Sequence, residues 1–331
     1  MTETQLYDTI IIGGGPAGLT AALHLAFHKR KVLVIDRRTG PLWYTTTPLW
    51  NVPGFIGKPG VTIQKTLLKE AQEAGAESVK DSVVSVSGTE GNFTVTGEKG
   101  TYQARTLLLA TGVARHHPLV NGDFEPWFKY AAKGNTYYCP DCESPELLGQ
   151  DVVVIEGRNP NGAVSQATYL AEFASRVRLL LTGPTEFKPE WEEKRKKLGF
   201  EVIHGSIQDV DGAKGKVNAL ILDDGTRLEA DAYYVSNPKF PRNDLAVQLG
   251  AETGQRGHIL TGPRGQVRKA GGHDHDFIAG VWAAGDVQPQ TQQVTIAMGS
   301  GNKAAVMIDQ HLTHEHVRQL GKQPIQVGTD D

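Results

Sequence analysis

The 331-residue sequence contains only two cysteines and no long run of apolar residues. A membrane-spanning helix needs about 18 consecutive apolar residues, and a signal peptide needs a basic start and an apolar segment, so neither is expected. Neither sign of charge dominates, because 34 basic and 37 acidic residues leave a net charge of −3. That balance gives no reason to expect nucleic acid or a membrane as a partner. We therefore expect a cytoplasmic protein.

The composition is that of a folded protein with ordinary apolar content. Hydrophobic residues make up 39% of the chain and charged residues 21%, which argues against disorder. The length suggests about two domains of roughly 150 residues each. The 38 glycines show no collagen-like period, so we expect them at tight turns and close backbone contacts.

The two cysteines, Cys139 and Cys142, lie in one CPDC segment. A structural zinc site normally needs four Cys or His ligands, and no second cysteine pair exists. A C-x-x-C pair in a cytoplasmic α/β chain is typical of a redox dithiol. The spacing therefore predicts a redox-active disulfide.

A nucleotide-binding pattern begins near the N-terminus. Residues 7–12 (YDTIII) predict a buried strand, GGGPAG follows at 13–18, residues 19–27 favour a helix, and residues 31–36 (KVLVID) predict a second strand. Gly13 permits the turn, Gly15 lets the backbone approach a pyrophosphate, and Gly18 lets helix and strand pack closely. Asp36 is placed to accept a hydrogen bond from a ribose hydroxyl. The pattern indicates a dinucleotide site.

Three further stretches extend this pattern: LLLATG at 107–112, VWAAGD at 281–286 and QQVTIAMG at 292–299. Together with the glycine loop and the CPDC segment, they resemble the flavoprotein disulfide reductases. The low-molecular-weight thioredoxin reductases match best, since all five motifs fall in that family's order and cover nearly the whole chain.

The resemblance implies an α/β fold with two Rossmann-like dinucleotide-binding domains. An FAD-binding domain would comprise residues 1–116 and 243–331, and an inserted, degenerate NADPH-type domain at 117–242 would carry the CPDC motif. The residues assigned to FAD by the resemblance are Gly13, Gly15, Pro16, Ala17, Gly18, Asp36, Thr45, Asn51, Val83, Thr111, Gly112, Gly285, Asp286, Gln293 and Val294.

Two of these assignments imply specific contacts. Asp286 would hold the ribityl and pyrophosphate region, and the helix that opens at Gln293 would direct its N–H groups at the N1/O2 edge of the flavin. Simpler roles stay open, namely loop capping for Thr45 and Asn51 and helix capping for Asp286.

The second strand–loop–helix unit departs from the family. Residues 151–155 (DVVVI) predict a buried strand and 163–174 a helix, but EGRNPNG at 156–162 replaces the second glycine fingerprint. Glu156 puts a negative charge where phosphate should lie, and Pro160 removes an amide donor. We expect the fold of this unit to be kept and its NADPH site to be lost.

The following strand also lacks a nucleotide signal. It ends in Thr-Gly-Pro at 182–184. At this position, NAD-binding proteins carry an acidic residue and NADP-binding proteins an arginine. Arg176 and Arg178 lie within the strand and are poor substitutes, although Arg158 in the loop could compensate in part.

The resemblance implies that Cys142 is the sulfur nearer the flavin and that Cys139 attacks the disulfide of a thioredoxin-type protein. Relatives carry an aspartate after the second cysteine as acid and base, and Glu143 occupies that position here. Asp141, between the cysteines, is an alternative proton carrier. The simpler interpretation of both acids is a solvated turn.

If NADPH is excluded, electrons must reach the flavin from another donor. A one-electron protein such as ferredoxin fits, because flavin accepts electrons singly and delivers them in pairs. The chain resembles the NADPH-independent, ferredoxin-linked branch of the family. The alternatives are an NADPH-dependent reductase with a remodelled loop, a flavin thiol oxidase, and a flavin redox sensor. The resemblance also implies a homodimer.

Histidines gather in two places, with His273 and His275 in an HDHD segment and His311, His314 and His316 near the C-terminus. No cysteine or carboxylate framework supports a metal at this spacing. We expect an exposed polar loop and tail, and no metal site.

Overall fold

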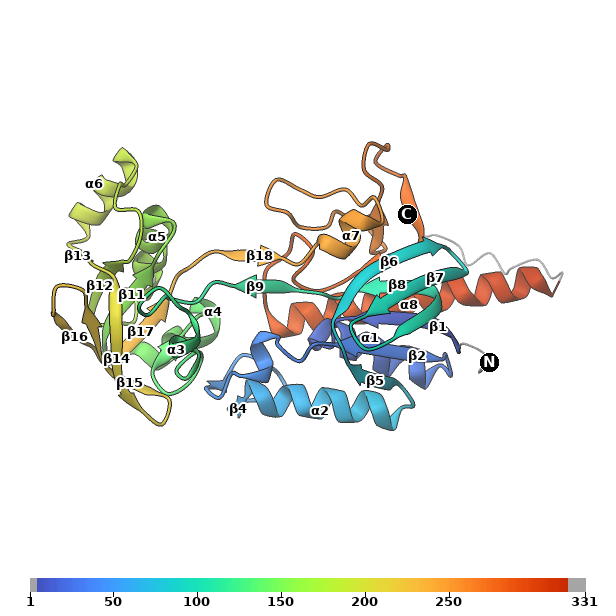
Figure 1. The fold of residues 1–331 in the computed structure, drawn as a ribbon, viewed down its shortest axis with the longest axis horizontal. Helices are drawn as coiled ribbons and strands as arrows, with labels where there is room; N and C mark the ends of the chain where they lie inside the picture. The colour runs from blue at the N-terminus through green and yellow to red at the C-terminus, as the bar shows by residue number, and fades with distance from the viewer. Residues whose placement is uncertain (1–4, 321–331) are drawn as a thin grey trace. The chain divides into compact units, whose positions relative to one another are not determined.

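The computed structural model describes residues 5–320 and divides the chain into two compact units. Unit 1 comprises Met1–Gly40, Gln64–Ala114 and Phe240–Asp331, and unit 2 comprises Pro41–Ile63 and Arg115–Lys239. Figure 1 labels most elements of both units. The later borders, at 114/115 and 239/240, lie close to those that the resemblance implies.

Residues 41–63 group with unit 2, which differs from the expected FAD-binding domain of residues 1–116. The hydrogen bonds of this segment explain the grouping. The Thr46 amide donates to the Ala132 carbonyl over 3.0 Å, and the Thr47 hydroxyl donates to Glu143 over 3.3 Å. The segment is thus bound to the residues around the cysteine pair.

Unit 1 is built on an eight-stranded sheet with the order β19-β20-β8-β1-β2-β5, to which β7 and β6 are added beside β8. Strand β1 runs parallel to both β2 and β8, with Ile12 opposite Ile35 and Leu109. The strands are β1 (Leu6–Ile12), β2 (Val32–Asp36), β5 (Glu77–Lys80), β6 (Val83–Thr89), β7 (Asn92–Gly97), β8 (Thr101–Leu109), β19 (Gln266–Arg268) and β20 (Phe277–Ala283).

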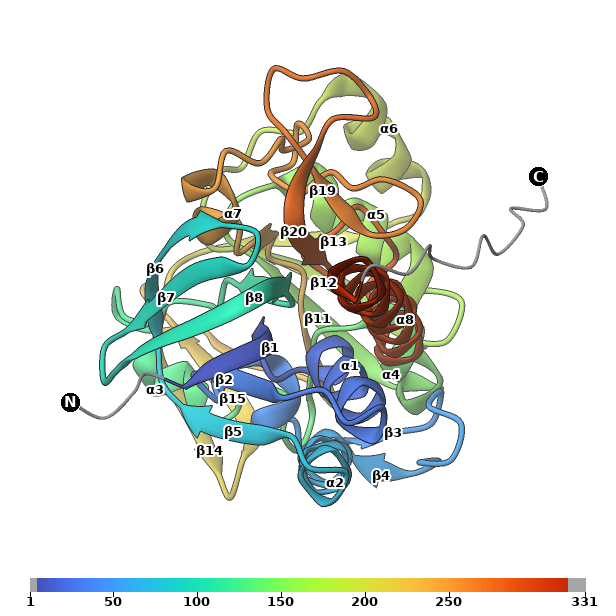
Figure 2. The same cartoon turned by 90° about the vertical axis from the view of Figure 1, so that its right-hand side faces the viewer.

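The helices of this unit are α1 (Pro16–Phe27), α2 (Gly60–Glu73), whose first residues belong to the 41–63 segment, α7 (Asp244–Gln248) and α8 (Val294–Gln319). Helices α1 and α8 lie side by side along the sheet (Figure 2). Their backbones come very close, because a Cβ on Gly301 would lie 2.1 Å from the Ala17 carbonyl oxygen. The missing side chain of Gly301 therefore allows α8 to pack closely against α1.

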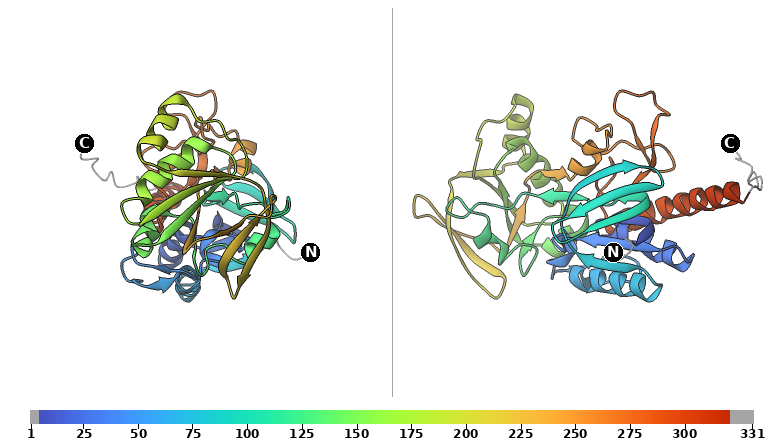
Figure 3. Two further views of the ribbon diagram at one scale, coloured as in Figure 1. Left: turned by 90° about the vertical axis from the view of Figure 1, so that its left-hand side faces the viewer. Right: turned by 45° about the vertical axis from the view of Figure 1, so that its right-hand side comes forward.

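Unit 2 contains a parallel five-stranded sheet with the order β10-β17-β11-β12-β13 and an antiparallel sheet with the order β14-β15-β16. Figure 3 shows both. The strands are β10 (Thr136–Tyr137), β11 (Asp151–Glu156), β12 (Arg176–Leu181), β13 (Glu201–His204), β14 (Ile207–Ala213), β15 (Lys216–Leu222), β16 (Arg227–Glu229) and β17 (Ala232–Val235). The helices are α3 (Glu125–Phe128), α4 (Pro140–Glu143), α5 (Pro160–Leu170) and α6 (Pro189–Lys197).

Strand β11 is buried on both faces, as expected for a central parallel strand. Val152 and Val154 belong to a core cluster with α5, whereas Val153 and Ile155 belong to a cluster with β15 and β17. The strand therefore ends at Glu156 between two packed layers, where it delivers the following loop to the carboxyl edge of the sheet.

Four short strands complete the fold. Strands β3 (Pro48–Leu49) and β4 (Lys58–Pro59) pair within the 41–63 segment, and the connecting strands β9 (Val113–Arg115) and β18 (Lys239–Pro241) pair with each other. None of the helices among residues 5–320 is long and apolar enough to cross a membrane.

Candidate functional site

The glycine loop of unit 1 has the geometry that a dinucleotide needs. Gly13 has a φ of +108°, and a Cβ there would lie 2.2 Å from the Ala110 carbonyl oxygen. A Cβ on Gly18 would lie 1.9 Å from the Gly13 carbonyl oxygen, whereas one on Gly15 would meet nothing within 4 Å. Gly13 and Gly18 thus serve the packing of the loop, and Gly15 leaves open space over its backbone.

The start of α1 is suited to an anion. Gly15 is its N-cap, no side chain caps the helix, and Pro16 and Ala17 open a first turn without acidic residues. The N–H groups at this end therefore keep their partial positive charge for a ligand. Asp36 ends β2 beside the loop, since a Cβ on Gly14 would lie 2.9 Å from the Asp36 Cβ. These residues fit the pyrophosphate and ribose of FAD.

The other expected flavin residues of unit 1 lie at strand ends and at a helix start. Thr111 and Gly112 follow β8, and the Thr111 hydroxyl donates to the Arg242 carbonyl over 2.6 Å, so it fixes the backbone. Gly285 and Asp286 follow β20, and the Gly285 amide donates to the Ser300 hydroxyl over 2.8 Å.

Gln293 and Val294 form the N-cap and first residue of α8, whose first turn contains no acidic residue. This is a second helix end without a negative charge of its own. Val83 begins β6, and its side chain packs against the core of unit 1. Its expected contact with FAD stays a prediction.

Cys139 and Cys142 form a disulfide with their Cα atoms 5.3 Å apart. Cys139 is the N-cap of the short helix α4, and its carbonyl accepts the amides of Cys142 and Glu143 over 3.3 and 3.1 Å. Both cysteines are partly exposed, while Asp141 between them is exposed. The structure therefore presents the disulfide on a tight helical turn that solvent can reach.

Glu143 is only 4% exposed and holds this turn together. Its Oε2 accepts the backbone amides of Tyr138 and Cys139, each over 2.8 Å, and its other oxygen accepts the Thr47 hydroxyl. Burial raises the pKa of Glu143, although the amide hydrogen bonds and Arg115 oppose the shift. A carboxyl with a raised pKa next to a disulfide is suited to general acid chemistry.

Two expected flavin residues, Thr45 and Asn51, belong to unit 2. Thr45 is buried and donates its hydroxyl to the Pro41 carbonyl over 2.9 Å. The Asn51 side-chain amide donates to the Asp141 carbonyl over 3.5 Å. Both side chains therefore stabilise loops, as in the simpler interpretation, and their flavin contacts stay predictions.

The loop after β11 fills its own anion site. The Oε1 of Glu156 accepts the amides of Arg158 and Asn159 over 2.8 and 3.1 Å, and the Gly157 amide donates to the Asn237 side chain over 2.8 Å. Glu156 is 1% exposed, and burial raises its pKa. Three amides of the loop that leads into α5 are therefore already occupied.

The two arginines of β12 form contacts within unit 2. Arg178 is 8% exposed, pairs with Asp151 over 2.9 Å and donates to the Glu229 carbonyl. Arg176 pairs with Glu201 over 2.7 Å. Neither arginine lies at the end of the strand, where a protein of this type would bind the 2′-phosphate of NADPH.

A pocket of about 660 Å³ nevertheless opens beside this loop in unit 2. Its lining includes Arg115, His116, His117 and Arg158, and no acidic residue lies among the described residues that form it. Burial lowers the pKa of His117 to about 4, with Arg115 adding to the effect. The positive charge of the pocket at neutral pH therefore comes from its two arginines.

A buried aromatic network behind the disulfide is not visible in any sequence motif. The Tyr138 hydroxyl accepts the Trp127 indole N–H over 2.7 Å and shares a hydrogen bond of 2.8 Å with Nδ1 of His117. The Arg115 guanidinium lies over the Tyr138 ring, 5.3 Å from its centre. Tyr138 directly precedes Cys139, so these contacts hold the residue next to the disulfide in place.

The HDHD segment behaves as expected. His273 and His275 are exposed, and Asp274 forms an ion pair with Arg268. His311 differs, because it lies only 32% exposed beside Glu90 and Glu315.

Comparison with known proteins defines the class. The family model for pyridine nucleotide-disulphide oxidoreductases matches residues 7–301, and the chain belongs to this family. It is accordingly an FAD-dependent oxidoreductase, and its close cysteine pair makes it a flavin-dependent disulfide oxidoreductase similar to thioredoxin reductases.

The similarity extends over nearly the whole chain. Thioredoxin reductase from Bacillus subtilis is 28% identical over 95% of this chain and 97% of the relative. NADPH-dependent thioredoxin reductase 3 from Arabidopsis thaliana is 29% identical over 96% of this chain, which is 60% of that relative. Thioredoxin reductase from Giardia duodenalis superposes with a TM-score of 0.74 at 28% identity, covering 93% of this chain and 99% of its own.

The crystal structure of HlmI superposes with a TM-score of 0.82 at 25% identity and covers 97% of both chains. These relatives confirm the expected α/β fold, the FAD cofactor and the type of enzyme.

Proposed function

We propose that this protein reduces the disulfide of a thioredoxin-type protein and that its electrons reach the flavin without NADPH. The first part rests on the disulfide turn and on relatives named thioredoxin reductases. The second part rests on one observation, the Glu156 carboxyl bound to the amides of Arg158 and Asn159. A ferredoxin-type protein is the proposed donor, since flavin accepts electrons singly and delivers them in pairs.

The Glu156 contact opposes NADPH in two ways. The carboxyl occupies the amides, so a pyrophosphate would have to displace it whatever its protonation state. When ionised it also repels phosphate, by about 4 kcal/mol for unit charges 4 Å apart at an effective dielectric of about 20. A penalty of that size weakens binding by roughly a thousandfold.

The chain's own groups then move protons and sulfur bonds. FAD, when bound, supplies the two electrons that reduce the Cys139–Cys142 disulfide, and two protons complete the dithiol. The Cys139 thiolate attacks the partner's disulfide and releases one partner thiol. Cys142 next attacks the Cys139 sulfur, which re-forms the internal disulfide and releases the second thiol. Glu143, with its raised pKa, donates and takes back protons beside the pair.

An NADPH-dependent reductase is the second candidate, and the pocket of about 660 Å³ favours it. Arg115 and Arg158 could bind phosphate groups there without the amides at the start of α5. The Arabidopsis relative is itself named NADPH-dependent. In this candidate, the nucleotide would enter by a route that avoids the Glu156 contact.

Anaerobic mixing separates the two candidates. The FAD-loaded protein is mixed with NADPH, NADH or reduced ferredoxin, and flavin reduction is followed by absorbance. The proposal expects rapid reduction by ferredoxin alone, whereas rapid reduction by NADPH would establish the second candidate.

Cysteine variants test the relay in the same system. Cys139→Ser and Cys142→Ser should both abolish thioredoxin reduction while FAD stays bound. Turnover retained in either variant would contradict the relay. A homodimer and a cytoplasmic location are further proposals, for which sedimentation and cell fractionation are the direct tests.

A further inference from the structure

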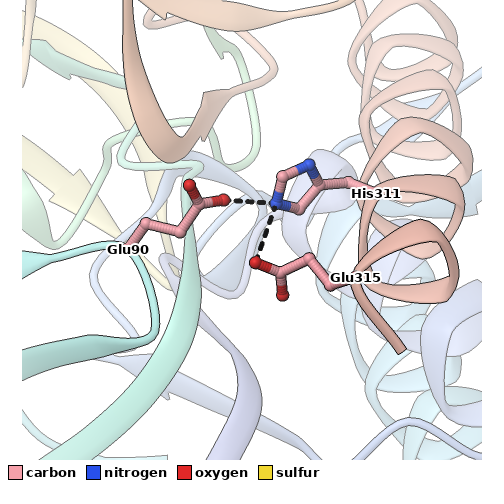
Figure 4. A group of neighbouring side chains, drawn as sticks. All are labelled: Glu90, His311 and Glu315. Atoms are coloured by element: carbon pink, nitrogen blue, oxygen red, sulfur yellow. Dashed lines mark ion pairs between the residues drawn. The ribbon is translucent and has the colours of Figure 1, made fainter. Parts of the chain in front are cut away.

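Three side chains of unit 1 that the redox reaction does not use converge on one point (Figure 4). Glu90 lies in the turn between β6 and β7, and His311 and Glu315 lie one helical turn apart on α8. The His311 Nε2 forms an ion pair with Oε1 of Glu90 and lies 3.9 Å from Oε1 of Glu315. All three atoms lie within 4.8 Å of one another.

The two atoms at the centre of this cluster are not satisfied by hydrogen bonds. Oε1 of Glu90 and Nε2 of His311 are buried, and neither has a hydrogen-bond partner among the described residues, although they are close neighbours. Buried polar atoms without hydrogen bonds are rare and call for a ligand, an ion or water. A cation between them would satisfy both atoms at once.

Neighbouring residues orient each of the three side chains. A Cβ on Gly280, whose φ is +72°, would lie 3.1 Å from the Glu90 Cβ and Cγ, so this glycine makes room for the Glu90 stem. The His311 ring packs against Trp282 with ring centres 5.2 Å apart. The second oxygen of Glu315 accepts from Arg105 over 2.9 Å.

Arg105 is itself held by Asp8 over 3.1 Å. The orientation of Glu315 therefore rests on a chain of two further contacts. Groups held in this way by a surrounding layer of contacts are what metal ligands require, because the outer contacts fix ligand geometry.

We propose that Glu90, His311 and Glu315 bind a divalent transition-metal ion of the zinc type. His311 would supply Nε2, each glutamate one oxygen, and water the fourth position. Two tetrahedral ligands of one zinc ion lie about 3.3 Å apart, so the 3.9 Å between Nε2 and the Glu315 oxygen must shorten slightly, and the directly contacting Glu90–His311 pair must separate to admit the ion. The imidazole ligand disfavours Mg²⁺ and Ca²⁺, which prefer oxygen.

The chemistry of such a site is structural. Zinc has no redox activity, so it would not exchange electrons with the flavin. It would join the β6–β7 turn to α8, the helix whose start carries the candidate flavin residues Gln293 and Val294.

The site departs from the expectation that His311 belongs to an exposed polar tail. The competing explanation is a direct contact of His311 with the two glutamates and no metal ion.

Zinc titration of the whole FAD-loaded protein decides between these explanations. The protein is stripped with a chelator, kept oxidised so that the Cys139–Cys142 pair cannot bind metal, and titrated with ZnCl₂ by calorimetry. We expect one zinc per chain with a dissociation constant in the micromolar range or tighter. Zinc at about 100 times that constant should raise the unfolding temperature by several degrees, and Mg²⁺ should not.

Variants locate the site. His311→Gln and Glu90→Gln should each weaken zinc binding at least about tenfold, and Gly280→Ala should weaken it by displacing the Glu90 stem. His314→Gln is the matched control, because His314 lies on the same helix and is exposed. Absence of saturable binding, or equal binding by His311→Gln and wild type, overturns the proposal. Circular dichroism and flavin absorbance verify that each variant is folded, and Glu315→Gln replaces any variant that is not.

Discussion

Replacement of Glu143 by glutamine removes the ionisable proton of this side chain but keeps an oxygen that accepts hydrogen bonds. A glutamine oxygen can still accept the amides of Tyr138 and Cys139, and its NH₂ group can reach Thr47, so the redox turn should keep its shape. The proton is lost. A positioned general acid or base contributes about 10² to 10⁴-fold in rate, so thioredoxin-type turnover should fall by that range.

Alanine at the same position should damage the fold instead. It leaves the buried amides of Tyr138 and Cys139 without an acceptor, which costs about 1–3 kcal/mol for each. The variant should therefore lose roughly 2–6 kcal/mol of unfolding free energy, measured by denaturant titration of the FAD-loaded protein. Asp141→Asn, at the exposed alternative proton carrier, is the comparison variant: it should leave the unfolding free energy unchanged, and a loss of turnover there would assign the proton role to Asp141 in place of Glu143.

The pH dependence of stability provides an independent check. The raised pKa means that the folded state holds the Glu143 proton more tightly than the unfolded chain does. This contribution is complete below the ordinary value of 4.5 and is lost as pH rises through the folded-state pKa. Glu143→Gln cannot titrate, so it lacks this pH dependence. The unfolding free energy of the variant relative to wild type should therefore increase as pH rises from about 4.5 through the folded-state pKa of Glu143. Wild-type turnover in Glu143→Gln, or a stability difference that does not change with pH, would refute the reasoning.

Other positions give equally direct tests. Glu156→Gly frees two loop amides and should speed anaerobic flavin reduction by NADPH at least about tenfold over wild type; an unchanged rate would mean that the carboxyl is not the obstacle. Gly15→Ala should fold normally yet bind FAD weakly, whereas Gly18→Ala should also lower stability by about 1–3 kcal/mol, and equal unfolding curves would contradict this difference. Tyr138→Phe should cost about 1–3 kcal/mol in denaturant unfolding because the buried Trp127 N–H loses its acceptor, and no change would disprove that role.

The elements of both nucleotide-type units could be predicted from the sequence because their signals are local. One short segment contains the signals for the strand at 7–12, the glycine loop and the helix that follows. Strand β1 and helix α1 occupy those positions in the structure. The hairpin of β15 and β16 also carries a local signal, because Asp223, Asp224 and Gly225 are typical turn residues.

The features that shape the candidate site depend on contacts distant in sequence. The buried Glu143 accepts a hydrogen bond from Thr47 of the 41–63 segment, and nothing near the cysteines indicates that partner. The network of His117, Trp127 and Tyr138 likewise joins helix α3 to two other segments of the chain. Glu156 was identified as a repulsive charge, yet its capture of the loop's own amides follows only from the backbone turn after β11.

The loop after β11 meets a demand that the strand end itself creates. Backbone donors that lie between packed layers need an acceptor, and an unmet donor there would destabilise unit 2. The acid at the last strand position supplies that acceptor from within the loop. Under the proposed function, any variant that is to gain NADPH binding must therefore provide these donors with a substitute acceptor whenever the coenzyme is absent.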